Sequence, residues 1–354
     1  MDSDHFNVDE LKHILRPGSS AAKIDWGNEE HRRCMVACMV KGAYVLESDR
    51  AMGRTEAAAL APAWCESFHF SINQKLTEES EVATYGAIYE HVPGPRHPSA
   101  PRYVVAFRGT MLRHPELAVV MKDLYLDFKT LTNKLHKRTR SKRACGAVDK
   151  LMDGQAGLGS ADVWLAGHSL GASLALEVGR AMMERRELNH PTFLFNPPQV
   201  SLTAAINFLH PIALVKTPLH YASYFLKTGA GILLDSHRGD MENLFELLSP
   251  WVPNLYVHEK DWICQGFIDY FELRQQFVDS FPCAGSSSMT LSYRDMLWRL
   301  LGKNKERPHL MPSATLWKTA QSRLDPHGLQ QWWKPDSELG LGAGTRYSYP
   351  VPQA

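Results

Sequence analysis

Short apolar runs alternate along this chain with longer segments in which apolar residues recur at helical spacing. Five of the runs predict strands, at residues 82–92, 103–107, 163–166, 192–195 and 255–257. A helical region precedes them at about residues 28–49, and further helical segments separate the strands. Regular alternation of this kind is typical of layered α/β folds. We therefore expect a mostly parallel central sheet flanked by helices.

The length of the chain fits one large domain. Its 354 residues are enough to bury a sizeable core, and we expect a single domain over residues 1–336. Within it, we expect a helical N-terminal region at about residues 1–80 and a helical insertion at about residues 201–250. The last segment, residues 337–354, is rich in Gly, Pro, Ser and Tyr, which predicts a disordered tail.

Residues 201–234 come closest to a membrane-spanning segment. Lysines, prolines and histidines interrupt the apolar positions, so the segment lacks the roughly 18 to 20 uncharged apolar residues that cross a bilayer. One interpretation is a pair of core-packed helices joined at Pro211 and Pro218. The other is a segment that lies on a lipid surface or covers an apolar pocket.

The charges of the chain balance almost completely. It has 39 basic and 38 acidic residues and a formal net charge of +1, so no overall field attracts nucleic acid or an anionic membrane. A basic run at residues 134–143 predicts a solvated helix face, with contact to an anionic lipid surface or another polyanion as the alternative. We expect no nucleic-acid partner, and only a peripheral association with membranes or lipid droplets.

The N-terminus and the cysteines both indicate a cytoplasmic protein. Residues 1–17 include four acidic residues and no apolar run, which does not fit an ordinary secretory signal. The six cysteines have no spacing typical of a zinc site or a disulfide framework. We expect reduced thiols that act as small hydrophobic side chains, and neither a metal nor an organic cofactor.

Residues 163–174 carry the strongest chemical signal in the chain. An apolar strand runs through Gly167-His168-Ser169-Leu170-Gly171, a G-x-S-x-G pentapeptide, into an amphipathic helix. This is the context of a nucleophile elbow, in which the glycines allow a tight turn and the serine hydroxyl is exposed at its crest. The alternative is a purely structural turn. We predict that Ser169 is the nucleophile of a serine hydrolase.

A serine nucleophile needs a histidine that takes its proton and a carboxylate that orients the histidine. In α/β-hydrolases the acid follows the serine and the histidine comes last. Asp261 fits the acid, because it follows the short strand at residues 255–257 and a polar turn. A helix N-cap is the structural alternative for Asp261. The other candidates for the acid are Glu259, Asp235 and Asp240.

The histidine is expected on a loop near the end of the chain. His327 lies between Pro326 and Gly328, so its backbone is in a turn that can direct the ring into a site. An ordinary surface histidine is the structural alternative. The other candidates for the histidine are His309 and His237.

The oxyanion that forms when a serine attacks a carbonyl needs preorganised N–H donors. One predicted donor is the backbone N–H of Leu170, at the start of the elbow helix, where N–H groups have no intrahelical partner. The second is the backbone N–H of Thr110, which follows a buried strand in Phe107-Arg108-Gly109-Thr110. An ordinary strand-ending turn is the alternative for that segment.

Two segments together resemble a known family. Phe107-Arg108-Gly109-Thr110 and Gly167 to Ala172 are similar to motifs of the class 3 lipase family of α/β-hydrolases. The resemblance is closest to its plant lipase-like members, some of which are labelled GDSL esterase/lipase, because residues 45–50 (Val-Leu-Glu-Ser-Asp-Arg) and 328–333 (Gly-Leu-Gln-Gln-Trp-Trp) are also similar to theirs. The resemblance implies that Thr110 and Leu170 bind the oxyanion. His327 matches the family's histidine in position, whereas the approach to Asp261 matches only loosely, and no Gly-Asp-Ser-Leu occurs.

The resemblance also implies a reaction. In relatives, the segment after the oxyanion loop forms a lid, which here corresponds to residues 111–122; an ordinary helix is the alternative. We predict a serine esterase or lipase that hydrolyses carboxylic esters of acyl lipids through an acyl-serine intermediate. The alternatives are a non-catalytic lipid-binding or scaffold protein on the same fold, and an acyltransferase with the same nucleophile.

Overall fold

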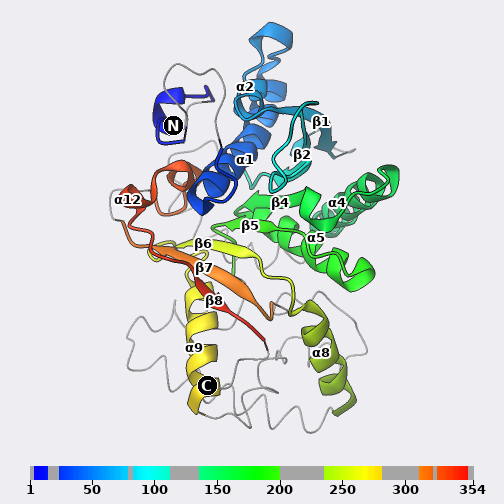
Figure 1. The fold of residues 1–354 in the computed structure, drawn as a ribbon, viewed down its shortest axis with the longest axis vertical. Coiled ribbons are helices and arrows are strands. Elements are labelled where there is room, and N and C mark those ends of the chain that lie inside the picture. Colours follow the sequence, from blue (N-terminus) through cyan, green and yellow to red (C-terminus); the bar gives the residue numbers. More distant parts are fainter. Residues whose placement is uncertain are drawn as a thin grey trace.

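The computed structural model describes residues 4–14, 24–78, 83–111, 135–199, 235–280, 311–321 and 325–349. In this part of the chain, eight strands form one sheet in the order β1 to β8 (Figure 1). Pairing is parallel from β3 to β7 and antiparallel at both edges. The strands are β1 (Phe70–Thr77), β2 (Thr84–His91), β3 (Tyr103–Phe107), β4 (Val163–His168), β5 (Thr192–Phe195), β6 (Asn254–His258), β7 (Ala314–Thr319) and β8 (Thr345–Tyr347).

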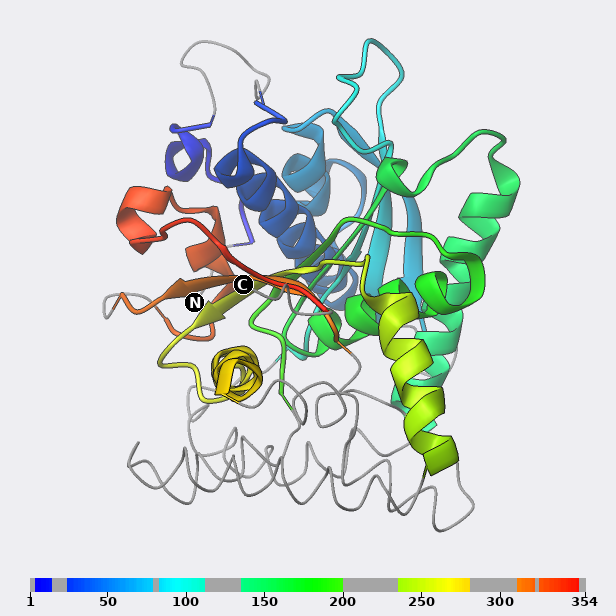
Figure 2. The same ribbon diagram turned by 60° about the horizontal axis from the view of Figure 1, so that its bottom comes forward.

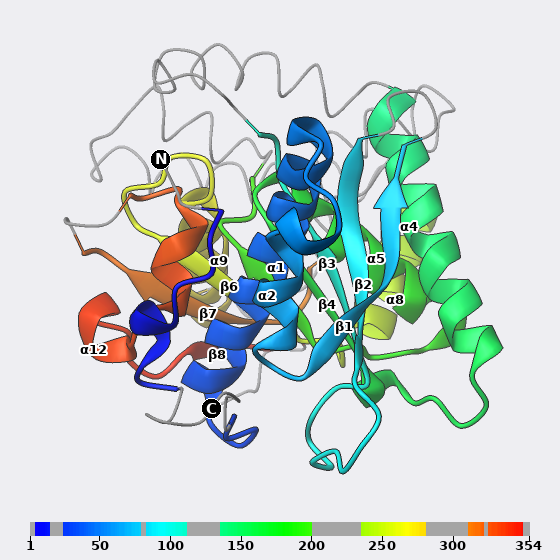
Figure 3. The same ribbon diagram turned by 90° about the horizontal axis from the view of Figure 1, so that it is seen from above.

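Helices cover both faces of the sheet (Figure 2, Figure 3). Helices α1 and α2 and the 3-10 helix η4 pack on one face, and α4, α5, α8 and α9 pack on the other. The helices are η1 (Val8–Leu11), α1 (Glu29–Met52), η2 (Glu56–Ala58), α2 (Ala61–Glu66), α4 (Leu135–Gly154), η3 (Ser160–Asp162), α5 (Leu170–Arg186), α8 (Asp235–Leu248), α9 (Gly266–Ser280), η4 (Leu329–Trp333) and α12 (Asp336–Leu339).

Strand β3 shows why two helical layers are needed. All five of its residues are buried, and its alternate side chains enter different cores. Val105 and Phe107 pack on the side of α5, whereas Val104 and Ala106 pack on the side of α1. A strand that is apolar on both faces is stable only inside a three-layer arrangement.

Helix α1 is the long element of the second layer. The side chain of Asn28 caps its first turn by accepting the Glu30 N–H, and the helix ends at Gly53, whose φ of 65° is left-handed. The middle of the helix, from Arg33 to Asp49 with the exception of Tyr44, is buried. Its Tyr44 is half-buried and reaches the end of β4, where its hydroxyl contacts His168.

The register of the parallel strands determines where the site forms. Phe107 of β3 lies opposite Gly167 of β4, and His168 lies opposite Phe195 of β5. Phe195 in turn lies opposite Tyr256 of β6. The carboxyl ends of these strands therefore coincide at one edge, which is where α/β sheets place their functional loops.

The predicted fold class is confirmed: the sheet is mixed, mostly parallel and flanked by helices. The five predicted strands correspond to β2 to β6. The sequence patterns do not predict β1, which lies inside the N-terminal region expected to be helical, nor β7 or β8. Strand β1 escapes prediction because it is an edge strand with mostly exposed, polar side chains, so it lacks a clear apolar run.

The prediction of a disordered tail at residues 337–354 is wrong for its described part. Strand β8 pairs antiparallel with β7, and Tyr347 and Tyr349 are each only 9% exposed. Their rings pack against Phe271 of α9 and Phe245 of α8. Two aromatic side chains that bury this much apolar surface hold a segment that its Gly-rich composition alone would leave loose.

Several predictions fall wholly or partly outside the described residues. These are the insertion as far as residue 234 and the lid-like segment from residue 112 onward. Within the described ranges, none of the helices combines the length and apolar character needed to cross a membrane. The end of the basic run lies on α4, where Arg140 pairs with the buried Glu78.

Candidate active site

Strand β4 turns directly into helix α5 at Ser169. The backbone of Ser169 has φ 54° and ψ −125°, a region that non-glycine residues rarely occupy and that is often found at functional turns. A Cβ on Gly167 would lie 2.2 Å from the carbonyl oxygen of Gly171, and one on Gly171 would lie 2.3 Å from that of Phe107. Both positions of the elbow therefore require glycine, and the elbow is held against the end of β3.

The structure brings together the three side chains that the sequence suggests as a triad. Ser169 Oγ donates a hydrogen bond to His327 Nε2 at 2.9 Å. His327 Nδ1 donates to Asp261 Oδ2 at 2.7 Å. The His327 side chain is 22% exposed, whereas that of Asp261 is 1% exposed. The serine and the imidazole are thus accessible, and the carboxylate is buried beneath them.

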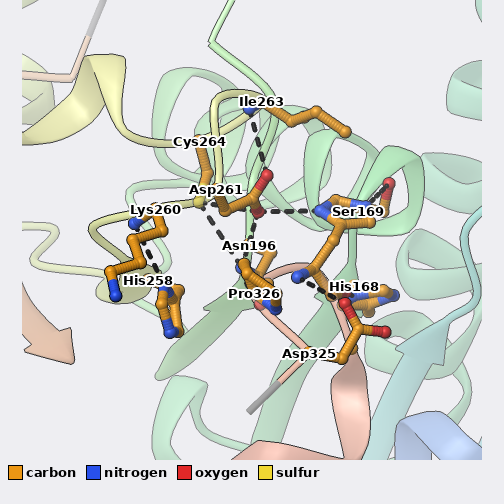
Figure 4. A network of polar contacts seen from close by, with 12 residues as sticks. His168, Ser169, Asn196, His258, Lys260, Asp261, Ile263, Cys264, Asp325 and Pro326 are labelled. Atoms are coloured by element: carbon orange, nitrogen blue, oxygen red, sulfur yellow. Dashed lines mark hydrogen bonds and ion pairs between the residues drawn. The ribbon is translucent and has the colours of Figure 1, made fainter. Parts of the chain in front are cut away.

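Asp261 uses its two oxygens for different purposes. Oδ1 accepts the backbone N–H of Ile263 at 3.1 Å, whereas Oδ2 accepts from Asn196 Nδ2 at 2.7 Å and Cys264 Sγ at 3.0 Å, in addition to His327 (Figure 4). Burial alone would raise the pKa of Asp261, but the hydrogen bonds from His327, Cys264 and Asn196 and the charge of His327 outweigh it and hold the pKa below 3.8. The carboxylate is therefore ionised at neutral pH, and it both caps a turn and orients the histidine.

His327 lies in a tight turn, residues 325–328, whose backbone carbonyls accept hydrogen bonds from three buried side chains. Gln331 Nε2 donates to three of these carbonyls, at 2.8 to 3.1 Å. The proline carbonyl of the turn also accepts from Asn196 Nδ2 at 2.9 Å. The His327 carbonyl accepts from His168 Nε2 at 2.8 Å. This turn is not part of a helix or strand, so these bonds hold the backbone that carries the imidazole.

The alternative acids and histidines do not meet the serine in the described residues. Glu259 is exposed in the turn after β6, and Asp240 is exposed on α8. The side chains of Asp235 and His237, and all of His309, lie outside the described part of the chain. Of the candidates that can be placed, His327 is the one in contact with Ser169, and Asp261 is the one in contact with His327.

The predicted oxyanion loop lies directly against the elbow. A Cβ on Gly109 would come within 2.9 Å of Ser169 Cβ, and Thr110 follows Gly109 as an exposed residue. Arg108 Nη1 donates to the Gly109 carbonyl at 2.8 Å. That carbonyl shares a peptide plane with the Thr110 N–H, so the guanidinium fixes the direction of the predicted donor. Leu170 begins α5, where an N–H has no intrahelical acceptor.

The residue before the nucleophile is a buried histidine. His168 is 7% exposed, and burial, together with the nearby charge of His327, lowers the pKa of His168 to about 3. The ring is therefore neutral at physiological pH. Its Nε2 donates to the His327 carbonyl, so its Nδ1 is an acceptor, and it accepts from Tyr44 Oη at 2.8 Å.

Sequence reasoning does not find the residues that support the triad. Asn196, Tyr44 and Gln331 lie on three separate elements, and no motif links them to the serine. Asn196 is the one that a sequence signal could have found, because a polar residue directly after a buried parallel strand lies at the edge where α/β sites form. The roles of Tyr44 and Gln331 depend on long-range packing alone.

The described part of the chain has five free cysteines, most of them buried. Its described residues include no group of three or more His, Cys, Asp or Glu side chains that could hold a metal ion. Its five cysteines are free thiols, and Cys283 lies outside. Burial raises the pKa of both Cys34 and Cys65 to about 12, so these thiols stay protonated and unreactive.

An elbow serine, hydrogen-bonded to a histidine that is hydrogen-bonded to a buried carboxylate at the carboxyl edge of an α/β sheet, is the arrangement of serine hydrolases. The chain matches no protein-family model. It is similar to the GDSL esterase/lipase At4g10955 of Arabidopsis thaliana, with 33% identity over 336 residues that cover 89% of this chain and 92% of the relative. The chain therefore belongs to this esterase/lipase family and is a carboxylic ester hydrolase.

Proposed function

We propose that the chain hydrolyses carboxylic esters of acyl lipids, with Ser169 as the nucleophile and His327 as the general base and then the general acid. Asp261 orients His327, and the N–H groups of Thr110 and Leu170 bind the oxyanion, as in class 3 lipases. The observation that carries the proposal is the unbroken hydrogen-bond path from Ser169 Oγ through His327 to the Asp261 carboxylate.

The proposed reaction has two matched halves. His327 Nε2 takes the Ser169 proton as Oγ bonds to the ester carbonyl carbon, and the carbonyl oxygen takes up the negative charge. The intermediate collapses when the protonated imidazole gives its proton to the departing alkoxide, which leaves an acyl-Ser169. Water then attacks with His327 again as base, so that the free acid departs and the serine hydroxyl is restored.

The electrostatics of the site support these roles. The depressed pKa of Asp261 keeps a negative charge next to His327, which stabilises the imidazolium that forms in each half-reaction. The start of α5 lies at Ser169, and a helix N-terminus favours the negative charge that develops on the substrate oxygen.

Two features support an acyl lipid as the substrate class. The relative from Arabidopsis thaliana is named an esterase/lipase. In this chain, residues 201–234, which come after β5 in the sequence, are rich in Leu, Ile, Ala and Phe. A segment of this composition suits contact with an acyl chain better than contact with a polar ester.

A fluorophosphonate probe followed by mass spectrometry tests the nucleophile. We expect wild-type protein to be labelled on Ser169, and Ser169→Ala and His327→Ala to remain unlabelled. The variant His309→Ala removes the other candidate histidine near the end of the chain. If His327 is the base, His309→Ala should be labelled like the wild type. Absence of labelling in wild type, with and without detergent or lipid, would favour the non-catalytic alternative.

A series of p-nitrophenyl esters tests the substrate class. We expect kcat/KM to rise from the acetate to the decanoate. Activity confined to the acetate would contradict a lipid substrate while leaving the serine hydrolase mechanism intact. Adding an alcohol acceptor separates hydrolysis from acyl transfer, since a transferase yields the new ester as its main product.

A further inference from the structure

We propose that Tyr44 is a positioning residue that, through His168, ties the oxyanion loop to the turn that carries His327. This inference rests on the proposed function, because it concerns how the same site is assembled. Tyr44 lies on α1, whereas the oxyanion loop follows β3 and the turn that carries His327 follows β7. Tyr44 therefore connects two loops that come from different strands.

The path consists of three hydrogen bonds of ordinary length. The Gly109 N–H donates to Tyr44 Oη at 2.8 Å, and Tyr44 Oη lies 2.8 Å from His168 Nδ1. His168 Nε2 lies 2.8 Å from the His327 carbonyl oxygen. The rings of His168 and His327 are also close, with centroids 5.1 Å apart.

The direction of every hydrogen in this path is fixed by chemistry. A carbonyl oxygen only accepts, so the single proton of a neutral His168 must be on Nε2. Nδ1 is then an acceptor, and Tyr44 must donate its hydroxyl proton to it. The Tyr44 oxygen in turn accepts from Gly109. Burial keeps His168 neutral, with a pKa of about 3, so the same pattern holds across the pH range in which a serine hydrolase works.

The need for such a tie follows from Gly109 itself. Glycine has the greatest backbone freedom, so an oxyanion loop that contains it is imprecise unless other groups hold it. Arg108 holds the peptide on the carboxyl side of Gly109, by donating to its carbonyl, and Tyr44 holds the peptide on the amino side, by accepting from its N–H. With both peptides held, the N–H of Thr110 keeps one direction. Donors placed this way need no reorganisation when the oxyanion forms.

The variant Tyr44→Phe tests the proposal, because it removes one oxygen atom and keeps the ring. We expect kcat to fall about 10- to 100-fold, less than the roughly 10²- to 10³-fold loss when an oxyanion donor is removed. KM for a p-nitrophenyl ester should change by less than about twofold, since the loss affects the transition state rather than the bound substrate.

An alkylboronic acid gives a readout that general damage to the structure would not mimic. It adds to the serine as a tetrahedral boronate, which resembles the transition state. We expect its inhibition constant to rise in Tyr44→Phe by about the same factor as kcat/KM falls. The matched control is Tyr89→Phe: Tyr89 is fully buried beside α1, and its hydroxyl has no hydrogen-bond partner among the described residues.

A second variant keeps the proposal testable if Tyr44→Phe folds poorly. His168→Gln retains a donor near the position of Nε2 but loses the acceptor for Tyr44. Because both changes break the same hydrogen bond, the double variant should lose little more activity than either single one. Two results would overturn the role of Tyr44 and leave the proposed function intact. One is a double variant whose loss of activity equals the product of the two single losses, and the other is a Tyr44→Phe protein with wild-type kcat and boronate affinity. An inert wild type that the fluorophosphonate does not label overturns the proposed function, and this role with it.

Discussion

The side-chain amide of Asn196 donates a hydrogen bond to Asp261 Oδ2 at 2.7 Å, the same oxygen that accepts from His327. The orientation of that amide is fixed, because its oxygen accepts from Trp332 Nε1, which is only a donor. Asn196 has a left-handed φ of 45°, which asparagine tolerates better than most residues. The residue that directly follows β5 therefore links the Asp261 carboxylate, the turn that carries His327 and the core.

The variant Asn196→Asp should disable the site while preserving its shape. It replaces a donor with a second carboxylate beside Asp261, so the pair will retain a proton and the pKa of one member will rise. We expect kcat/KM at pH 7 to fall about 100-fold or more, because Asp261 is no longer a reliable acceptor for His327, and to recover partly at higher pH. A pH profile of kcat/KM measures both effects.

The control for that variant is Asn189→Asp, which makes the same change at an exposed position, where the amide donates a hydrogen bond to the Pro250 carbonyl at 2.8 Å. It should leave the profile unchanged. If Asn196→Asp were as active as wild type at pH 7, the amide would have no part in holding Asp261.

The assignment of Asp261 as the acid leads to a second prediction. Asp261→Asn should lower kcat about 10³- to 10⁴-fold, because an amide in that place favours the wrong histidine tautomer. Glu259→Gln is the matched control, since Glu259 is two residues away but exposed, and it should keep nearly full activity. The reverse result in an ester hydrolysis assay would transfer the role of the acid to Glu259.

Gln331 provides a third prediction, on the turn that presents His327. Its Nε2 donates to three backbone carbonyls of residues 325–328, so Gln331→Met keeps the volume and removes these bonds. We expect the free energy of unfolding to fall by about 1 to 3 kcal/mol and kcat to fall about tenfold, because the imidazole is held less firmly. Urea unfolding and ester hydrolysis check the two effects. Gln330→Met, which lies outside this set of bonds, should change neither.

The parts of the site that were predictable from sequence are those with local signals. The G-x-S-x-G elbow around Ser169 could be recognised because strand, turn and helix are adjacent in the chain and the two glycines are sterically required. Asp261 and His327 could be ranked among their alternatives because each follows a turn in the order expected after the serine.

The remaining features were not predictable, because their physical causes are not local. Tyr44 reaches the site only since α1 packs across β4, and Gln331 acts only once its turn is formed. Likewise, β8 is ordered by the burial of Tyr347 against α9 and by pairing with β7, neither of which its own Gly-rich composition reveals.

The lowered pKa of His168 leads to a prediction about stability. Its pKa is about 3 in the folded protein against 6.5 for an ordinary histidine, so below pH 6.5 the unfolded chain binds a proton that the folded chain does not. Acid therefore favours unfolding, by about 1.4 kcal/mol per pH unit between these two values. His168→Gln lacks this group, so the free energy of unfolding of the wild type should fall relative to that of the variant by about 2 to 3 kcal/mol from pH 7 to pH 4.5. Urea unfolding of both proteins at several pH values measures this change. The contributions of the other buried histidines cancel in the comparison, because both proteins contain them. Parallel pH curves for the two proteins would mean that His168 is protonated as easily when folded as when unfolded, and that Tyr44 is not its fixed donor.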